Sequence, residues 1–135
     1  MKFIIDIGHP AHVHMYHYVA QHLIEHGHQV LFTCRDKEFE VLLLQHFGFD
    51  YVNFGRKHRS SIMKACDLVR FVCKEIWVAL KFRPDMFLSH GSPIATFTGR
   101  LLHIPHITPE DTFNMSAAIF PINQCFLSTP YSSCL

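Results

Sequence analysis

Residues 2–14, which read KFIIDIGHPAHVH, decide the fold of this chain. The first six, Lys2 to Ile7, form a short and mostly apolar run that is typical of a buried strand. Gly8 and Pro10 then break the run. From His12 to His26 apolar side chains recur at helical spacing, at Val13, Tyr16, Ala20 and Leu23. The sequence therefore predicts a strand that turns directly into an amphipathic helix.

The same alternation of strand and helix continues along the chain. Further strand-like segments span residues 29–33, 49–54, 85–89, 104–108 and 125–127. Helical patterns run from Asp36 to Gly48, from Ser60 or Ser61 to Pro84, over residues 94–102 and, weakly, over 112–119. Strands that alternate with helices favour a parallel sheet with right-handed crossovers. The expected fold class is α/β, with a Rossmann-like, mainly parallel sheet and helices on both faces.

Two of the expected helices have apolar stripes that predict which of their faces pack on the sheet. In the helix that Asp36 is expected to cap, the stripe consists of Phe39, Leu42, Leu43 and Phe47. In the long helix before Pro84 it consists of Ile62, Cys66, Val69, Cys73, Ile76 and Leu80.

Composition narrows the class of protein. The chain has 135 residues, 49% of them hydrophobic and 17% charged, which suits one ordered domain with its own core. Twelve Lys and Arg residues against 11 Asp and Glu residues give a formal net charge of +1, so no nucleic-acid partner is expected. No stretch reaches the roughly 18 apolar residues of a transmembrane segment.

The cysteines and the N-terminus favour a cytoplasmic protein. Five cysteines are present, an odd number without a CxxC pair, and reduced thiols are their simplest interpretation. Asp6 interrupts the apolar run at the N-terminus, so this run is interpreted as a buried strand rather than as a signal peptide.

The turn after the first strand is the first candidate site, because parallel sheets bind ligands beyond the carboxyl ends of their strands. It contains Gly8 and three histidines, His9, His12 and His14. A histidine at this edge can contact an anion or act as a general base on a sugar hydroxyl. The structural alternative is that these histidines cap the helix or fill the wall of the crevice.

Two later turns at the same edge supply further candidates. His90, Gly91 and Ser92 follow the strand at 85–89, and Asp111 and Thr112 follow the strand at 104–108. Gly91 permits close approach of the backbone to a ligand, and Asp111 can orient a hydroxyl. The alternatives are a plain strand-to-helix turn for the first segment and helix capping by Asp111 or Thr112 for the second.

A basic loop and a group of histidines were considered as ion-binding sites. The loop from Arg56 to Arg59 could bind phosphate, although a solvated loop is the commoner outcome. The clustered histidines make a zinc binder a rival interpretation, but no HExxH or CxxC pattern is present. We therefore predict no metal site.

With these motifs in view, the sequence resembles the prokaryotic group called domain of unknown function 354. The most specific likeness is the opening motif DIGHPAHVH, residues Asp6 to His14. The resemblance continues through residues 25–30, 35–37, 48–51, 83–85 and 90–93, and it extends to about Pro130.

That group is similar to GT-B glycosyltransferases, so the resemblance implies one of two Rossmann-like domains that face a cleft. Residues 1–130 would form the N-terminal, acceptor-side domain and residues 131–135 a truncated tail. The C-terminal nucleotide-binding domain would be missing, and the chain would be inactive alone. The implied partners are a nucleotide sugar or glycan acceptor and the missing domain. His9 and His12 would lie in the acceptor loop, and no cofactor is implied.

Two alternatives remain open. The group is also similar to UDP-N-acetylglucosamine 2-epimerases, which carry a His-Gly-Asp-Thr turn where this chain has residues 90–93, HGSP. They also carry a His-Val-Glu-Ala-Gly turn where this chain has residues 106–110, HITPE, with the acid shifted. Both departures disfavour the epimerase. The second alternative is a noncatalytic truncated remnant.

Overall fold

The computed structural model describes residues 1–35 and 39–109, and the backbone of residues 124–125. Within them one parallel sheet has the strand order β3-β2-β1-β4-β5-β6. The strands are β1 (Lys2–Ile7), β2 (Gln29–Cys34), β3 (Tyr51–Asn53), β4 (Met86–Ser89), β5 (His106–Ile107) and β6 (Gln124–Cys125). The helices are α1 (Pro10–Glu25), α2 (Glu40–Phe47), α3 (Ser61–Phe82) and α4 (Pro93–Leu102).

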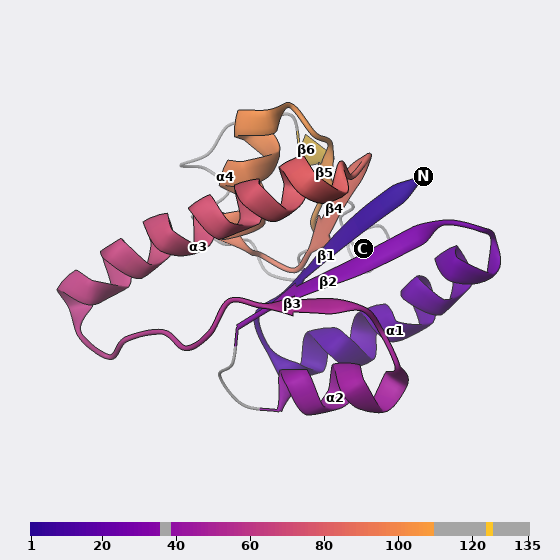
Figure 1. Cartoon of the computed structure of the whole chain (residues 1–135), viewed down its shortest axis with the longest axis horizontal. Coiled ribbons are helices and arrows are strands. Elements are labelled where there is room, and N and C mark those ends of the chain that lie inside the picture. Colours follow the sequence, from indigo (N-terminus) through magenta and orange to yellow (C-terminus); the bar gives the residue numbers. More distant parts are fainter. Residues whose placement is uncertain (36–38, 110–123, 126–135) are drawn as a thin grey trace, which may run out of the picture.

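The predicted fold class is confirmed. Helices α1 and α2 pack on one face of the sheet and α3 and α4 on the other, so a hydrophobic core lies on each side (Figure 1). None of the helices in the described part of the chain combines the length and the apolar composition that crossing a bilayer requires.

β1 is the strand about which the sheet is organised. Lys2 of β1 lies opposite Gln29 of β2, and Phe3 lies opposite Met86 of β4, both in parallel register. The chain first winds outward from β1 to β3, and α3 then carries it back to β4 on the other side of β1. The winding direction therefore reverses between β1 and β4, and ligands of such sheets bind at this switch point.

Helix α1 follows its sequence pattern. The helix has His9 as its N-cap and Pro10 in its first turn, where a missing N–H costs nothing. Val13, Tyr16 and Ala20 are buried against the sheet, as predicted. The stripe of α1 is thus a true core face, and it fixes the turn between β1 and α1 against the edge of the sheet.

Helix α2 departs from its predicted stripe. It begins at Glu40, and the expected cap, Asp36, lies outside the described residues. Leu43 and Phe47 of the predicted stripe are partly buried and pack against the core. Phe39 and Leu42, the other two, are 64% and 61% exposed, and Leu44, outside the stripe, is fully buried. The helix has only eight residues, and Leu44 is packed into the core. Side chains on the opposite side of this short helix, such as Leu42, therefore remain exposed.

The predicted stripe of α3 is wrong. Ile62, Val69 and Leu80 are 60 to 81% exposed, and Cys66 and Cys73 are exposed as well. The buried residues of α3 are Asp67, Phe71, Glu75, Val78 and Ala79. The error has a physical cause: the core face contains two acids, and a hydrophobicity pattern assigns acids to the solvent side. The apolar stripe on the opposite side therefore faces solvent.

Candidate functional site

A cavity of about 530 Å³ opens at the carboxyl ends of β1 and β4, which is the switch point of the sheet. The turn after β1, the turn after β4, the start of the chain after β2 and helix α3 contribute its walls. Its lining residues are Gly8, His12, Arg35, Lys57, Lys64, Leu68, Phe71, His90, Gly91, Ser92, Pro93 and Ile94.

His12 is brought to this cavity by the first turn of α1. The backbone N–H of Gly8 lies 3.4 Å from His12 Nδ1, and the rings of His12 and His90 are 4.9 Å apart between centroids. Burial lowers the pKa of His12, and the neighbouring His90 ring lowers it further. His12 is therefore neutral near pH 7, and since Nδ1 accepts from Gly8, its proton lies on Nε2.

The other two histidines of the opening motif lie in different surroundings. His9 is exposed at the N-cap of α1, where its Nδ1 accepts from the N–H of Ala11 at 3.2 Å. Its ring centroid is 6.1 Å from that of His12. His14 is exposed and lies beside Phe47 of α2, away from the cavity lining. The structure thus brings His12, but not His14, to the cavity.

The turn after β4 forms the opposite wall. Gly91 has a positive φ of 60°, a conformation that glycine adopts without strain, and its N–H donates to Thr108 Oγ1 at 2.9 Å. Ser92 is the N-cap of α4, and its Oγ accepts from the N–H of Ala95 at 3.4 Å. His90, Gly91 and Ser92, predicted to line the site, all line the cavity.

A buried ion pair supports the floor of the cavity. Arg35 Nη2 lies 2.9 Å from Asp6 Oδ2 and donates also to the carbonyl of Ile7 at 3.1 Å. Ser92 Oγ donates to the same carboxylate. Asp6, near the end of β1, is thus bonded to one residue that follows β2 and to one that follows β4. Asp6 is 1% exposed and Arg35 is 7% exposed. The turns that carry His12 and His90 are therefore attached to one buried carboxylate.

A second carboxyl group, that of Glu75 in α3, lies beneath this pair. Thr33 Oγ1 lies 3.1 Å from Asp6 Oδ1 and 3.2 Å from Glu75 Oε1. Burial raises the pKa of Glu75 well above its usual range, and the nearby Asp6 carboxylate raises it further. Glu75 is therefore a neutral acid. One arrangement of protons satisfies both hydrogen bonds: the protonated carboxyl group of Glu75 donates to Thr33 Oγ1, and the Thr33 hydroxyl donates to Asp6.

The basic loop before α3 is tied down rather than fully solvated. The N–H of His58 donates to Asp67 Oδ2 at 2.6 Å, and His58 Nδ1 lies 2.9 Å from Asp67 Oδ1. The hydrogen bond from this backbone N–H, more than any charge, lowers the pKa of Asp67. Anchored in this way, the loop places Lys57 in the cavity lining beside Lys64 of α3.

The Lys, Arg, Asp and Glu side chains among the described residues that line the cavity are all positively charged ones. Arg35, Lys57 and Lys64 contribute cations, and no acidic residue is among the described residues that line the cavity. The charge of Arg35 is balanced by Asp6 beneath it, and Lys57 and Lys64 add two further cations to the wall. Such a cavity suits a ligand that carries both hydroxyl groups and an anionic group.

Two predicted site residues, Asp111 and Thr112, lie outside the described residues. In the part of the chain that the structure covers, no group of three or more His, Cys, Asp or Glu side chains is placed to hold a metal ion.

The predicted site residues did not include Arg35, Lys57 and Lys64, although the loop that contains Lys57 was considered as a phosphate-binding segment. A signal existed for Arg35, which directly follows β2 at the edge where ligands bind. For Lys57 the basic loop was such a signal, but a solvated loop was judged the commoner outcome, because its anchoring partner, Asp67, lies nine residues beyond His58. Lys64 had no comparable signal.

Neither a comparison with protein-family models nor a search of curated proteins gives a match to this sequence. The resemblance to domain of unknown function 354 therefore stays a prediction.

Solved structures do match the fold. MurG from Acinetobacter baumannii superposes with a TM-score of 0.73 over 95% of this chain and 44% of its own, at 16% identity. A UDP-GlcNAc 2-epimerase from Neisseria meningitidis, solved with UDP-GlcNAc bound, has a TM-score of 0.68 at 19% identity, over 87% and 35%. The glycosyltransferase VinC, solved with dTDP, has a TM-score of 0.64 at 12% identity, over 82% and 34%.

At these identities the likeness shows the fold alone. The chain spans less than half of the length of each of these proteins. Its α/β sheet and flanking helices are similar to one part of these glycosyltransferases and of the UDP-GlcNAc 2-epimerase.

Proposed function

We propose that the chain is the N-terminal, acceptor-side domain of a cytoplasmic GT-B-like glycosyltransferase that uses nucleotide sugars in polysaccharide or cell-surface glycan synthesis. The observation that carries the proposal is the cavity at the β1/β4 switch point, which collects His12, His90 and two lysines. The likeness to glycosyltransferases supports this function, and the share of their length that the chain covers supports a partner domain as its complement.

His12 is the proposed contact to the reacting hydroxyl of the acceptor. A general base must be neutral, and the lowered pKa of His12 meets this requirement. It must also present an unprotonated nitrogen to the substrate. The 3.4 Å contact from Gly8 holds the proton on Nε2. For base catalysis through Nε2 this contact has to open, so that the proton can move to Nδ1.

Lys57 and Lys64 are the proposed contacts to an anionic group of the same substrate. A lysine ammonium binds phosphate as a compact point charge, and the N-terminus of α4, which also lines the cavity, adds the positive end of the helix dipole. Gly91 and Ser92 would shape the wall against which the sugar lies.

The remaining predicted residues keep their roles as proposals. His9 would contact the acceptor from the mouth of the cavity, and Asp111 and Thr112 would orient hydroxyls. His14 has the weakest support of the set, because it lies beside Phe47 and not in the lining.

A 2-epimerase is the second candidate, favoured by the structural likeness to an enzyme solved with UDP-GlcNAc. It requires a carboxylate in the cleft. The described lining of the cavity contains none, so the transferase is preferred.

The test is a pair of titrations of the 135-residue chain. In ¹H–¹⁵N NMR, sugar phosphates should shift the amides of Gly8 and Gly91. His12→Gln should weaken the response, while His22→Gln, at an exposed histidine of α1 outside the lining, should leave it unchanged. In calorimetry, UDP should bind no tighter than about 1 mM, or roughly −4 kcal/mol. Tight binding of UDP, or sugar phosphates that shift only residues elsewhere, would contradict an acceptor-side domain.

A further inference from the structure

The outer side of α3 carries an apolar stripe that nothing in the described residues covers. Ile62, Val69, Trp77 and Leu80 are each at least 60% exposed, and their spacing places them on one side of the helix. Over its 22 residues the helix is about 33 Å long, and the stripe runs along most of it. Single exposed apolar residues are ordinary, but a contiguous stripe of this length marks an interaction surface.

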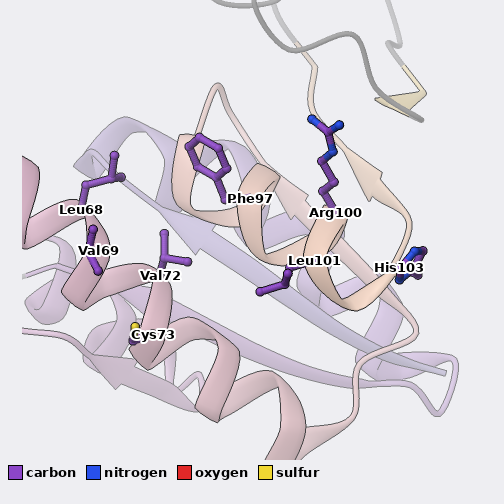
Figure 2. Close-up of a pocket in the computed structure, with 8 residues that line it drawn as sticks. All are labelled: Leu68, Val69, Val72, Cys73, Phe97, Arg100, Leu101 and His103. Carbon is purple, nitrogen blue, oxygen red and sulfur yellow. The ribbon is translucent and has the colours of Figure 1, made fainter.

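The stripe continues into a groove between α3 and α4. Figure 2 shows the groove, with Val69 and Val72 projecting from α3 and Phe97 and Leu101 from α4. Its volume is about 610 Å³, and Leu101 is 63% exposed beside it. Arg100 and His103 lie on its α4 side. Helices α3 and α4 therefore present one joined apolar face, the α3/α4 face.

The charges around this face are of one sign. Eight of the twelve Lys and Arg residues of the chain lie within residues 55–83: Arg56, Lys57, Arg59, Lys64, Arg70, Lys74, Lys81 and Arg83. The two acids in the same span, Asp67 and Glu75, are buried. Residues 86–109 contain no acid at all. The net charge of +1 thus conceals a strong separation of charge. Arg70, Lys74 and Lys81 of α3 and Arg100 of α4 flank the exposed apolar face as a basic rim, whereas Lys57 and Lys64 line the cavity.

We propose that the α3/α4 face binds an anionic lipid surface, with α3 lying in the plane of that surface. A helix that lies on a membrane combines an apolar side with flanking Lys and Arg, because the apolar side enters the acyl region while the cations meet the headgroups. The α3/α4 face has both parts. The chemistry recognised is a bilayer that carries negative headgroups.

Charge complementarity favours this occupant over a second copy of the chain. Two such faces brought together would bury apolar area but would also oppose like charges, those of Arg70, Lys74 and Lys81 among them. A nucleic acid would satisfy the cations and leave the apolar stripe in water. An anionic bilayer satisfies both.

The fluorescence of Trp77 can report the binding of the α3/α4 face to lipid. It is the only tryptophan of the chain, it is 63% exposed, and the ammonium of Lys81 lies 5.2 Å from its ring centroid. Indole rings favour the boundary between headgroups and acyl chains. Insertion would therefore move the whole tryptophan emission of the protein toward the blue.

The experiment is a fluorescence titration of the 135-residue chain with vesicles. Vesicles of phosphatidylcholine with about 30% phosphatidylglycerol should give a blue shift and quenching by lipids brominated in the acyl chain, and pure phosphatidylcholine vesicles should bind far more weakly. Raising the salt from about 0.1 M to about 1 M should weaken binding, because the Debye length falls from about 10 Å to about 3 Å.

Matched variants locate the surface. Leu80→Ser should weaken vesicle binding about tenfold, since a large apolar side chain no longer enters the lipid. Lys81→Gln should weaken it about fivefold, the contribution of one cation near an anionic surface. Leu42→Ser is the control: Leu42 is as exposed as Leu80, 61% against 60%, but lies on α2 on the other face of the sheet. Circular dichroism confirms that each variant is folded.

Three results would overturn the proposal: no blue shift with anionic vesicles, binding that Leu80→Ser and Leu42→Ser reduce equally, or a blue shift that appears with rising protein concentration in the absence of lipid. The last result would identify the face as an interface between copies. Failure here leaves the cavity proposal untouched, because the sugar-phosphate titration contains no lipid.

Discussion

At the scale of single residues, Asp6 determines the geometry of the site. Its carboxylate accepts from Arg35, Thr33 and Ser92, which come from the ends of β2 and β4. A buried charge that loses its partner costs about 3–5 kcal/mol, so this arrangement holds the three chain segments in place wherever the fold is intact. The turns that line the cavity are thus held in position by a carboxylate that is not itself part of the lining.

Glu75 gives a prediction at the same scale. A carboxylic acid whose pKa is raised on folding binds a proton that the unfolded chain releases above its ordinary pKa of 4.5. The native state then holds more protons than the unfolded state. The stability contributed by neutral Glu75 is complete below pH 4.5 and is lost as the pH rises toward the folded pKa, at most about 1.4 kcal/mol per pH unit.

Glu75→Gln should therefore remove this decline. In urea unfolding, the free energy of unfolding of the native chain should fall more steeply between pH 5 and pH 8 than that of the variant. Glu25→Gln, a change at an exposed glutamate, serves as the control and should follow the native curve. Parallel curves for the native chain and Glu75→Gln would mean that Glu75 is ionised in the folded protein.

At the scale of elements, α3 is a helix with two apolar sides. One packs on the sheet through Phe71 and Val78, and the other faces solvent through Val69 and Leu80. The core side accommodates Asp67 and Glu75 because each finds a partner from another element, His58 for the first and Thr33 for the second. A hydrophobic pattern cannot anticipate such partners, since both are distant in sequence.

Substitutions two residues apart on α3 should therefore differ sharply. Phe71→Ala should destabilise the protein by about 3–5 kcal/mol, because it opens a cavity in the core against Phe87 and Ile94. Val69→Ala should change stability by no more than about 0.5 kcal/mol. Thermal or urea unfolding of the two variants distinguishes the faces. Equal losses would show that the stripe containing Val69 is packed, as the sequence pattern predicted.

At the scale of the whole molecule, the fold places the ligand cavity and the α3/α4 face on the same half of the domain. Lys64 lines the cavity from the first turn of α3, and the apolar stripe extends along that helix from Ile62. An acceptor held in the cavity would thus lie next to the surface that we propose to bind lipid headgroups. The two proposals are nevertheless separate, since each rests on its own residues.

A ligand that binds in the cavity should raise the thermal stability of the whole domain. Glucose 1-phosphate at ten times its dissociation constant should stabilise the protein by about 1.4 kcal/mol, which raises the Tm of a domain of this size by about 5 °C. Glucose, which lacks the phosphate, should give a smaller shift. Lys64→Gln should reduce the shift by glucose 1-phosphate, whereas Lys81→Gln, outside the cavity, should leave it unchanged. An equal shift in both variants would place the anion elsewhere.

The sequence by itself determined the class of fold and the edge of the sheet at which the cavity opens. Both follow from local patterns: β1 and the stripe of α1 depend on side chains within a few residues of each other, and alternating elements leave few topologies open. The same reasoning placed Gly8, His12, His90, Gly91 and Ser92 at the cavity that the structure shows.

Only the tertiary structure decided which side of α3 is buried and which charged side chains line the cavity. Arg35 and Asp6 are 29 residues apart, and His58 and Asp67 meet only because the basic loop folds back onto α3. His12 and His14 are two positions apart, yet the helical turn sends one to the cavity and the other to Phe47. The physical reason is common to all of them. Burying a polar or charged side chain depends on a partner supplied from elsewhere in the chain, and a linear pattern contains no distances in space.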